Sequence, residues 1–188
     1  MISSSLGVLR GLVFKFFVGY NAYVADMKFV ADTMLGNLAR WLRILGYDTL
    51  YSSFFEDWRL LRVAEEEKRI LLTKDESLFR RARTRGLSAL LITSDDIAEM
   101  LAYVAAKTGA ELSFNPSRTR CPECNTLLMK ISKAEALSLL GGELITKYDE
   151  FWRCGKCGKI YWQGNHWRTI NSILEKANRL IINFSSKF

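Results

Sequence analysis

The chain has 188 residues, of which 49% are hydrophobic and 25% are charged. These values lie in the range of globular proteins and exclude an intrinsically disordered chain. The length allows one main hydrophobic core and one small appended module.

The net charge of +7 is distributed unevenly along the chain. Residues 1–115 carry 15 basic and 14 acidic side chains, whereas residues 116–188 carry 12 basic and 6 acidic ones. Such a basic field favours a polyanionic partner such as RNA or DNA, because binding releases condensed counterions. A basic surface that serves only solubility is the alternative.

The first 26 residues form an apolar extension that we leave out of the fold prediction. Residues 6–25 are apolar enough to raise the question of a membrane or signal segment. Arg10 and Lys15 interrupt that run, and no small-residue cleavage site follows it. Met27 stands directly before the first strand-like segment. We therefore interpret residues 1–26 as an upstream extension or a misassigned start, and we expect no membrane association.

Strand-like and helix-like segments then alternate as far as Gly109. Short apolar segments predict strands over residues 28–32, 48–52, 70–73 and 88–93. Helical spacing of apolar residues, with acidic starts and glycine stops, predicts helices over residues 33–45, 57–68, 76–85 and 96–108. This alternation is typical of the α/β class, in which helices cover both faces of a parallel sheet.

The composition changes near residue 115, and all four cysteines lie beyond this boundary. They form two pairs, Cys121-Pro-Glu-Cys124 and Cys154-Gly-Lys-Cys157, separated by 29 residues. Zinc binds four thiolates in a tetrahedron at about 2.3 Å, and such a closed site leaves no position for a substrate water. We therefore predict one structural zinc ion in a small ribbon. Two redox-active pairs are the disfavoured alternative, because a thioredoxin-like motif has one pair in a βαβ unit.

An acidic residue ends or closely follows each of three predicted strands. These residues are Asp32, Asp75 and Asp95, and Glu56 and Asp57 open the helix after the remaining strand. The carboxyl ends of parallel strands line one edge of a sheet, so we expect these side chains to converge. Carboxylates held close together need a cation, and Mg²⁺ or Mn²⁺ prefers oxygen ligands.

Helix capping is the competing interpretation of these acids. Asp57, Asp75 and Asp96 stand where helices begin, and Asp is a favoured N-cap. Capping explains such positions singly, whereas Asp32, at the end of an apolar strand, is harder to explain that way. Basic side chains near the same edge would hold RNA phosphates, unless they are simply solvated. The candidates are Arg40, Arg43, Lys74, Arg80 and Arg81.

Four stretches of the chain are specific when they are taken together. They are MKFVADTMLGNLARWLRILGYDTLY from Met27, LLTKD ending at Asp75, SRTRCPECN around Cys121 and FWRCGKCGKIYWQGNHW from Phe151. Over residues 27–180 the chain resembles the Mut-seven C-terminal ribonuclease domain family. The resemblance implies a PIN-like nuclease fold fused to a zinc ribbon, and a metal-dependent ribonuclease. It places the catalytic acids on Asp32 and Asp75, and also on Asp57 and Asp95.

We therefore expect a three-layer α/β/α PIN-like domain over residues 27–115, a zinc ribbon with a C-terminal helix over residues 116–180, and a tail over residues 181–188. The predicted protein is a cytoplasmic enzyme that cleaves single-stranded RNA, with a structural zinc ion and a catalytic Mg²⁺ or Mn²⁺ held by Asp32 and Asp75. Aromatic residues of the ribbon would offer surfaces on which bases stack. These are Trp152, Tyr161, Trp162 and Trp167.

Two other functions, a second enzymatic one and a non-catalytic one, are alternatives to RNA cleavage. An aspartyl-phosphatase mechanism at Asp32 usually needs a second aspartate two positions later, where this chain has Met34. A non-catalytic RNA- or ribosome-binding module would use the acids only as helix caps. The sequence leaves open the choice between Glu56 and Asp57 and between Asp95 and Asp96, as well as the RNA substrate and the oligomeric state.

Overall fold

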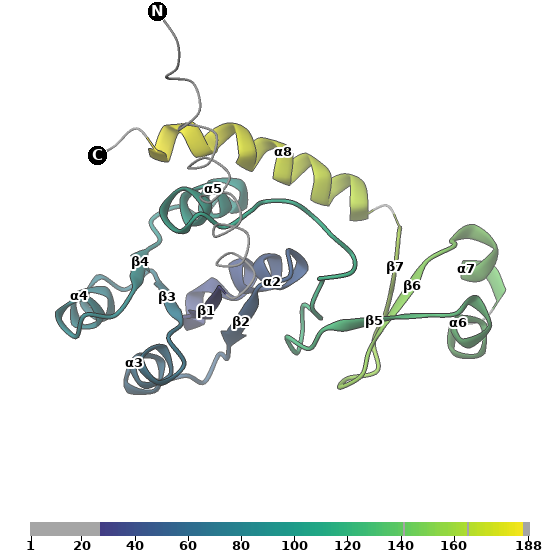
Figure 1. Ribbon diagram of the computed structural model, residues 1–188, viewed down its shortest axis with the longest axis horizontal. Coiled ribbons are helices and arrows are strands. Elements are labelled where there is room, and N and C mark those ends of the chain that lie inside the picture. Colours follow the sequence, from purple (N-terminus) through teal and green to yellow (C-terminus); the bar gives the residue numbers. More distant parts are fainter. Residues whose placement is uncertain (1–26, 141, 165, 186–188) are drawn as a thin grey trace, which may run out of the picture.

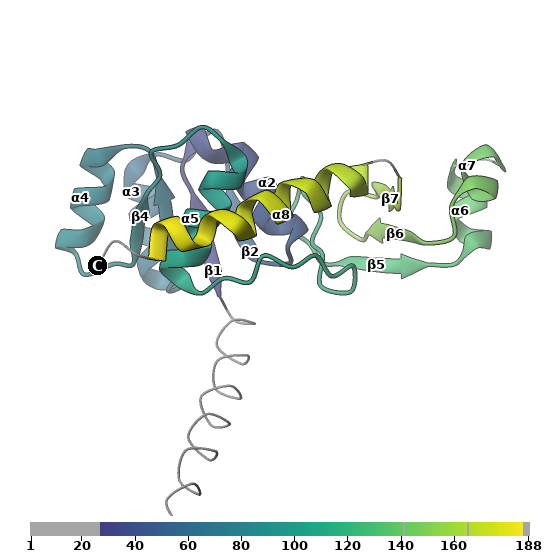
Figure 2. The ribbon, with the colours of Figure 1, turned by 90° about the horizontal axis from the view of Figure 1, so that it is seen from above.

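The computed structural model describes residues 27–140, 142–164 and 166–185 (Figure 1). The extension over residues 1–26, which we predicted to lie upstream of the fold, is outside the described residues. The described part contains a parallel sheet between helices, an antiparallel ribbon beside it, and a long helix that runs from the ribbon back over the sheet (Figures 1 and 2). Within it, no helix has the length and apolar character needed to cross a membrane.

Four parallel strands form the first sheet, in the order β2-β1-β3-β4. The strands are β1 (Lys28–Ala31), β2 (Asp48–Tyr51), β3 (Ile70–Thr73) and β4 (Ala89–Leu91). Successive side chains of β1 enter different hydrophobic clusters: Phe29 and Ala31 belong to one, and Val30 to the other. The sheet therefore buries both faces, as parallel strands joined by helices do.

Two helices cover each face of this sheet (Figure 1). They are α2 (Gly36–Ile44) and α5 (Ile97–Thr108) on one face, and α3 (Asp57–Glu66) and α4 (Glu76–Thr84) on the other. Leu38 and Leu101 pack in the cluster that contains Phe29, whereas Leu60 and Leu78 pack in the cluster that contains Val30. The predicted three-layer α/β arrangement is thus confirmed.

The segment predicted as one helix over residues 33–45 is divided in the structure. A 3-10 turn, η1 (Thr33–Leu35), follows β1, and α2 begins only at Gly36. The end of α2 depends on Gly46, whose backbone φ is +97°. A Cβ atom at that position would lie 2.9 Å from the carbonyl oxygen of Arg118, so a glycine is required both for the backbone conformation and for this close approach.

The ribbon is a three-stranded antiparallel sheet in the order β5-β6-β7 (Figure 2). Its strands are β5 (Leu128–Ile131), β6 (Phe151–Cys154) and β7 (Ile160–Trp162). Two short helices that the sequence analysis did not predict, α6 (Lys133–Leu140) and α7 (Gly142–Lys147), connect β5 to β6. The second cysteine pair lies at the turn between β6 and β7, and the first pair precedes β5.

The long helix α8 (His166–Ser185) leaves the ribbon after β7 and lies along α5 (Figures 1 and 2). Leu174 and Ala177 are buried in the same cluster as Phe29. Lys176 pairs with Asp96 at 2.8 Å, so α8 is also attached at the start of α5. The division of the chain at residue 115 stays a prediction, but α8, which we grouped with the ribbon, completes the core of the first sheet.

Candidate active site and metal centre

Asp32 lies directly after β1, at the carboxyl edge of the sheet, and is only 7% exposed. Its Oδ1 accepts hydrogen bonds from the backbone N–H and the hydroxyl of Thr33, at 2.5 and 3.2 Å. Asp32 therefore caps the turn η1, so capping accounts for this residue as well, although the sequence made it the hardest of the acids to explain in that way. Its Oδ2 has a different partner, since it accepts a hydrogen bond from the hydroxyl of Thr73 at 2.7 Å.

Thr73 connects Asp32 to Asp75. It is the last residue of β3, the strand that pairs with β1, and its Oγ1 accepts a hydrogen bond from the backbone N–H of Asp75 at 2.9 Å. Asp75 Oδ1 accepts from the N–H groups of Ser77 and Leu78 at 2.6 and 3.0 Å and so caps α4. Among the described residues, Asp75 Oδ2 has no hydrogen-bond partner. The structure thus brings Asp32 and Asp75 together through one hydroxyl and leaves one oxygen of the exposed carboxylate available.

The other two predicted acids lie at the same edge but are paired with basic residues. Asp57, at the start of α3, forms an ion pair with Arg81 of α4. Asp95, after β4, is 94% exposed and pairs with Lys74. Asp96 caps α5 through the N–H of Glu99 and pairs with Lys176.

The neighbouring acid Glu56 also lies outside any acid cluster. Its carboxylate accepts a hydrogen bond from the indole of Trp58. In the described part of the chain, the acidic residues do not form a group of three or more that could hold a metal ion. Of the four predicted acids, the geometry thus links Asp32 and Asp75 to one another and pairs Asp57 and Asp95 with basic residues.

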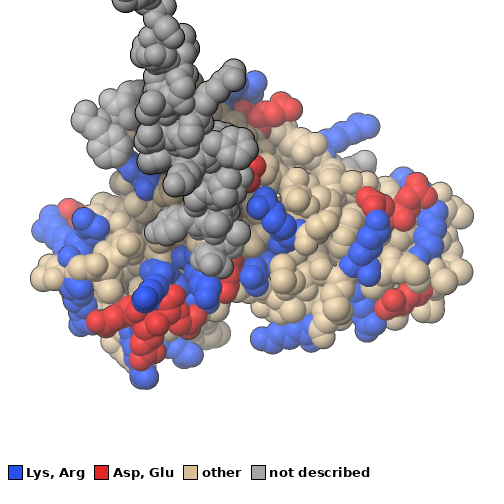
Figure 3. Space-filling view, in the orientation of Figure 1, with Lys and Arg blue, Asp and Glu red and all other residues tan. Residues whose placement is uncertain are grey.

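Two of the basic residues predicted to bind RNA occupy solvent-exposed helix faces. Arg40 is 58% exposed and lies 3.4 Å from Glu123, and Arg80 pairs with Glu76 one turn away at 2.6 Å. Lys74 and Arg81 lie beside the predicted acids. In the view of Figure 3, acidic side chains gather over the region of α3 with basic ones next to them, whereas the two signs are interspersed over the ribbon.

Arg43 differs from these four, because only 4% of its surface is exposed. Its Nε donates to the carbonyl of Thr49 at 2.9 Å, and its Nη1 donates to the carbonyls of Pro122 and Glu123 at 2.7 and 3.2 Å. Burial lowers the pKa of Arg43, and the neighbouring cysteines oppose that shift. An RNA phosphate could bind Arg43 only by displacing three internal acceptors. The RNA contact predicted for Arg43 is therefore replaced by an internal, structural role.

The four cysteines form the only group of three or more ligating side chains found in the described residues, with all four sulfur atoms within 4.8 Å of one another. Cys124 Sγ lies 3.4 Å from Cys121 Sγ and 3.3 Å from Cys154 Sγ, and Cys121 Sγ lies 3.7 Å from Cys157 Sγ. A zinc tetrahedron with bonds of about 2.3 Å places its sulfurs about 3.8 Å apart. The four residues can therefore surround one zinc ion with little rearrangement.

Burial and hydrogen bonds shift the pKa values of two of these thiols in opposite directions. Burial raises the pKa of Cys154, but hydrogen bonds from the backbone N–H of Cys157, the Cys124 thiol and the backbone N–H of Lys156 together outweigh that effect and lower the pKa to about 6. Burial raises the pKa of Cys124 to about 12. The Tyr161 hydroxyl lies 3.1 Å from Cys121 Sγ. Such outer hydrogen bonds orient the ligands of a zinc ion.

The model of one protein family, the Mut7-C RNAse domain, matches residues 27–174. This chain belongs to that family. The match extends from the start of β1 into α8, and so includes the acidic edge, the four cysteines and the ribbon. The predicted resemblance is thereby confirmed. Neither the curated proteins nor the solved structures gave a match to the chain.

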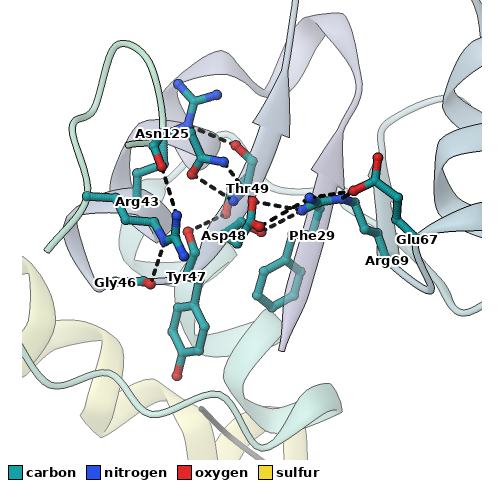
Figure 4. A network of polar contacts seen from close by, with 10 residues as sticks. Phe29, Arg43, Gly46, Tyr47, Asp48, Thr49, Glu67, Arg69 and Asn125 are labelled. Atoms are coloured by element: carbon teal, nitrogen blue, oxygen red, sulfur yellow. Dashed lines mark hydrogen bonds and ion pairs between the residues drawn. The ribbon is translucent and has the colours of Figure 1, made fainter. Parts of the chain in front are cut away.

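In this Mut7-C RNAse domain the first cysteine pair is attached to the opposite edge of the sheet, where β2 begins (Figure 4). Asn125, directly after Cys124, accepts a hydrogen bond from the N–H of Thr49 at 3.0 Å and donates to Asp48 Oδ1 at 2.7 Å. Arg69, which is 5% exposed, donates to both oxygens of Asp48 at 2.9 and 3.1 Å. The cysteine site and the sheet therefore share one hydrogen-bonded network.

Sequence reasoning did not identify three residues of these sites: Thr73, Asn125 and Arg43 in its internal role. A threonine two residues before Asp75 is ordinary in a strand, so nothing marked Thr73. A signal for Arg43 was present, since it follows Ala39 by four positions on the apolar face of the predicted helix. Asn125 has a backbone φ of +65°, a conformation for which asparagine is enriched, at the end of the cysteine turn.

Proposed function

We propose that this Mut7-C RNAse domain cleaves phosphodiester bonds of single-stranded RNA with a divalent ion, Mg²⁺ or Mn²⁺, bound by Asp32 and Asp75. The observation that supports it best is the hydrogen-bonded link from Asp32 through Thr73 to Asp75, at the carboxyl edge of a parallel sheet. Ligands of α/β sheets bind outside this edge. Two carboxylates, with water and substrate phosphate oxygens, are a ligand set typical of Mg²⁺.

Each side chain has a defined part in this proposal. Thr73 orients the buried carboxylate of Asp32, so that its charge is held at the end of β1. Asp75, fixed at Oδ1 by two backbone N–H groups, presents Oδ2 toward solvent. Lys74 and Arg81 lie on the same edge and would contact phosphates of the RNA. The bound ion would supply a water of lowered pKa and stabilise charge on the phosphate.

We further propose that the four cysteines bind one structural zinc ion. The distances between their sulfurs support this, as does the small size of the ribbon, which has few buried side chains of its own. Zinc would then supply folding free energy that the ribbon core lacks. The ribbon would add basic and aromatic surface for RNA.

The test is RNA cleavage by the full chain in the presence of Mn²⁺, with labelled single-stranded RNAs of several sequences. Asp32→Asn and Asp75→Asn should abolish cleavage. Asp96→Asn is the matched control, because Asp96 also caps a helix at this edge but pairs with Lys176 of α8. Loss of activity in the control alone, or full activity in the first two variants, would contradict the proposal.

The competing function is a non-catalytic RNA-binding module, and one observation favours it: Asp32, Asp75 and Asp96 all cap helices. Under that interpretation the Asn variants keep their RNA affinity and no variant, wild type included, cleaves RNA at any Mn²⁺ concentration. Measurements of binding and cleavage on the same variants therefore separate the two functions.

A further inference from the structure

An aromatic cavity lies where the ribbon, the segment after α5 and the start of α8 meet. Its volume is ≈ 210 Å³. Six of its lining residues have aromatic or imidazole side chains: Phe114, Trp152, Tyr161, Trp162, His166 and Trp167. The cavity lies on the side of the sheet where β2 begins, because Pro122 and Tyr161 of its lining also neighbour the cysteine site. Asp32 and Asp75 lie at the other edge.

The four aromatic residues that the sequence predicts as stacking surfaces, Trp152, Tyr161, Trp162 and Trp167, all line this one space. Trp152 is only 7% exposed, so its face is not offered to solvent. Phe114 meets Trp167 edge-to-face with ring centroids 4.4 Å apart, and Trp152 lies 6.4 Å from Trp167 with the ring planes at 31°. An apolar cavity of about 150 Å³ is large enough to bind benzene. The cavity therefore has room for one planar ring system.

The lining of the cavity combines aromatic rings with few polar groups. The indole rings of Trp162 and Trp167 are part of this largely apolar lining. His166 is exposed at the start of α8 and can donate or accept. The Tyr161 hydroxyl is hydrogen-bonded to Cys121 Sγ, and the Thr119 hydroxyl donates to the carbonyls of Ile44 and Asn115. A space bounded by aromatic rings suits a nucleobase, because every base has ring faces that stack on aromatic side chains.

A polar hollow that contains one basic and one acidic residue, Lys130 and Glu150, adjoins the cavity. It shares Pro116, Leu128 and Trp152 with the cavity. Lys130, which is 63% exposed, pairs there with Glu150 at 2.5 Å, so an RNA phosphate would compete with that carboxylate. A further hollow begins at Ser117, which both hollows share. It contains Arg118, which is 44% exposed and lies 3.5 Å from the carboxylate of Glu111. Cations beside an aromatic site are the arrangement with which proteins hold single strands, since the bases stack and the phosphates meet positive charge.

We propose that this cavity binds one unstacked base of single-stranded RNA, while Lys130 and Arg118 contact the phosphates next to it. The identity of the polymer as RNA rests on the proposed function; the site itself is separate from the carboxylate edge. The cavity would therefore act as an anchor that holds the strand at a distance from the place of cleavage.

Adjacent residues of β5 provide a matched test. Leu128 lines the cavity, whereas Met129 is 56% exposed and does not line it, because successive side chains of a strand point to opposite faces. Leu128→Trp should fill the cavity, and Met129→Trp should place the same indole in solvent. Both variants are made in the Asp32→Asn chain, so that RNA is not cut. Zinc content and thermal unfolding show whether each variant is folded.

Binding is measured by fluorescence anisotropy with a labelled single-stranded oligoribonucleotide and with the same strand carrying one abasic position. Leu128→Trp should weaken binding of the intact strand about tenfold, the loss expected for one aromatic stack, and Met129→Trp should not. Equal affinities of the two variants would overturn the proposal. If Leu128→Trp does not fold, Trp162→Leu is measured instead. It should also weaken binding about tenfold, and an unchanged affinity would overturn the proposal.

The abasic strand and the cleavage assay complete the test. The abasic position is moved along the strand in a series of oligoribonucleotides. A protein with an intact cavity should bind more weakly to the strand that lacks the base which occupies the cavity. An affinity that does not depend on the abasic position would overturn the proposal. In the chain that retains Asp32, cleavage is measured separately. If wild type cleaves RNA but Leu128→Trp does not change RNA affinity, the proposal of a base-binding cavity is contradicted and the ribonuclease proposal is not. RNA affinity that depends on Leu128, without cleavage by wild type, contradicts the ribonuclease proposal alone.

Discussion

Arg43 of α2 donates a hydrogen bond of 2.7 Å to the backbone carbonyl of Pro122, which lies inside the first Cys-x-x-Cys turn. The same guanidinium donates to the carbonyl of Thr49 in β2. One buried side chain thus joins a helix, a strand and the metal-binding turn. A planar group with several donors suits this position, because its acceptors lie in different segments.

Replacing Arg43 with lysine should therefore destabilise the protein although the charge is kept. A lysine ammonium cannot reach the carbonyls of Thr49 and Pro122 with the same geometry, and unsatisfied buried carbonyls cost free energy. We expect the free energy of unfolding to fall by about 2–3 kcal/mol in denaturant titrations. Arg40→Lys is the control on the same helix, and its 58% exposed side chain should give a change below about 0.5 kcal/mol. Similar losses for both variants would contradict the structural role of Arg43.

Loss of the zinc site should affect the edge of the sheet as well as the ribbon. Wild type purified without chelator should contain about one zinc ion per chain, and Cys154→Ser should contain none. Because the N–H of Thr49 donates to Asn125, disorder of the first cysteine turn should expose that amide. Hydrogen exchange at Thr49 should accelerate in Cys154→Ser. Exchange at Leu71, whose N–H donates to Ser88 within the sheet, should stay slow. Fast exchange at both amides would mean that the whole domain unfolds without zinc.

Asp32 and Asp75 should behave as one functional unit without being essential for folding. Asn at position 75 can still accept the N–H groups of Ser77 and Leu78, and Asn at position 32 can still cap η1. We expect each variant to unfold within about 1 kcal/mol of wild type. Mn²⁺-dependent cleavage should be lost in both, and the double variant should be no less active than either single one. A double variant that is much worse than either would mean that the two carboxylates act independently.

The ion pair of Asp48 should make stability depend on acid pH. Burial raises the pKa of Asp48, but hydrogen bonds from Arg69 and Asn125 outweigh burial and lower the pKa below its ordinary value. A carboxyl group with a lowered pKa in the folded state stabilises the protein above its ordinary pKa of about 4, and that contribution is lost as the pH falls through the folded pKa. The stability difference between wild type and Asp48→Asn should thus be constant near neutral pH and shrink below about pH 4.

Asp149→Asn is the control for this titration. The pKa of Asp149 is also lowered, by its hydrogen bond to Lys133, but that carboxylate is 90% exposed. Exposed pairs of this kind contribute little to stability because water screens them. Thermal unfolding of Asp149→Asn should follow the wild-type pH profile. If the thermal stability of Asp48→Asn also followed the wild-type pH profile, the role of the Asp48–Arg69 pair would be contradicted.

The hydrophobic periodicity of the sequence predicted the strands of the parallel sheet well, but it did not predict where the first helix is divided or where α8 packs. Each expected strand is present within about two residues of its predicted ends; the one over residues 88–93, for example, is Ala89–Leu91. Short apolar runs between helical segments leave few other arrangements. The division of the first helix after Leu35 was not predictable in this way, because Asp32 decides it through its hydrogen bond to Thr33. The docking of α8 on α5 was missed as well, since an amphipathic pattern does not say which surface it covers.

The cysteine cluster was predictable from spacing, because two Cys-x-x-Cys turns have few other uses. The acidic edge was predictable as a location but not as a set of ligands. Ion pairs with Lys74 and Arg81 engage Asp95 and Asp57, and no one-dimensional pattern shows which basic residue will lie opposite which acid. Contacts between the ribbon and the sheet, such as that of Asn125 with Thr49, join residues 76 positions apart and depend on the completed fold.

The position of α8 has a consequence for the order in which this protein folds during synthesis. Leu174 and Ala177 fill the core beside α5, and Tyr103 of α5 meets Phe184 with ring centroids 5.6 Å apart. The segment that supplies these side chains is translated after the whole ribbon. Until then, the outer surface of α5 is uncovered and apolar, a state in which nascent chains aggregate or need chaperones. The sheet made first is thus completed by the helix made later, and the nascent chain remains vulnerable until that helix has been translated.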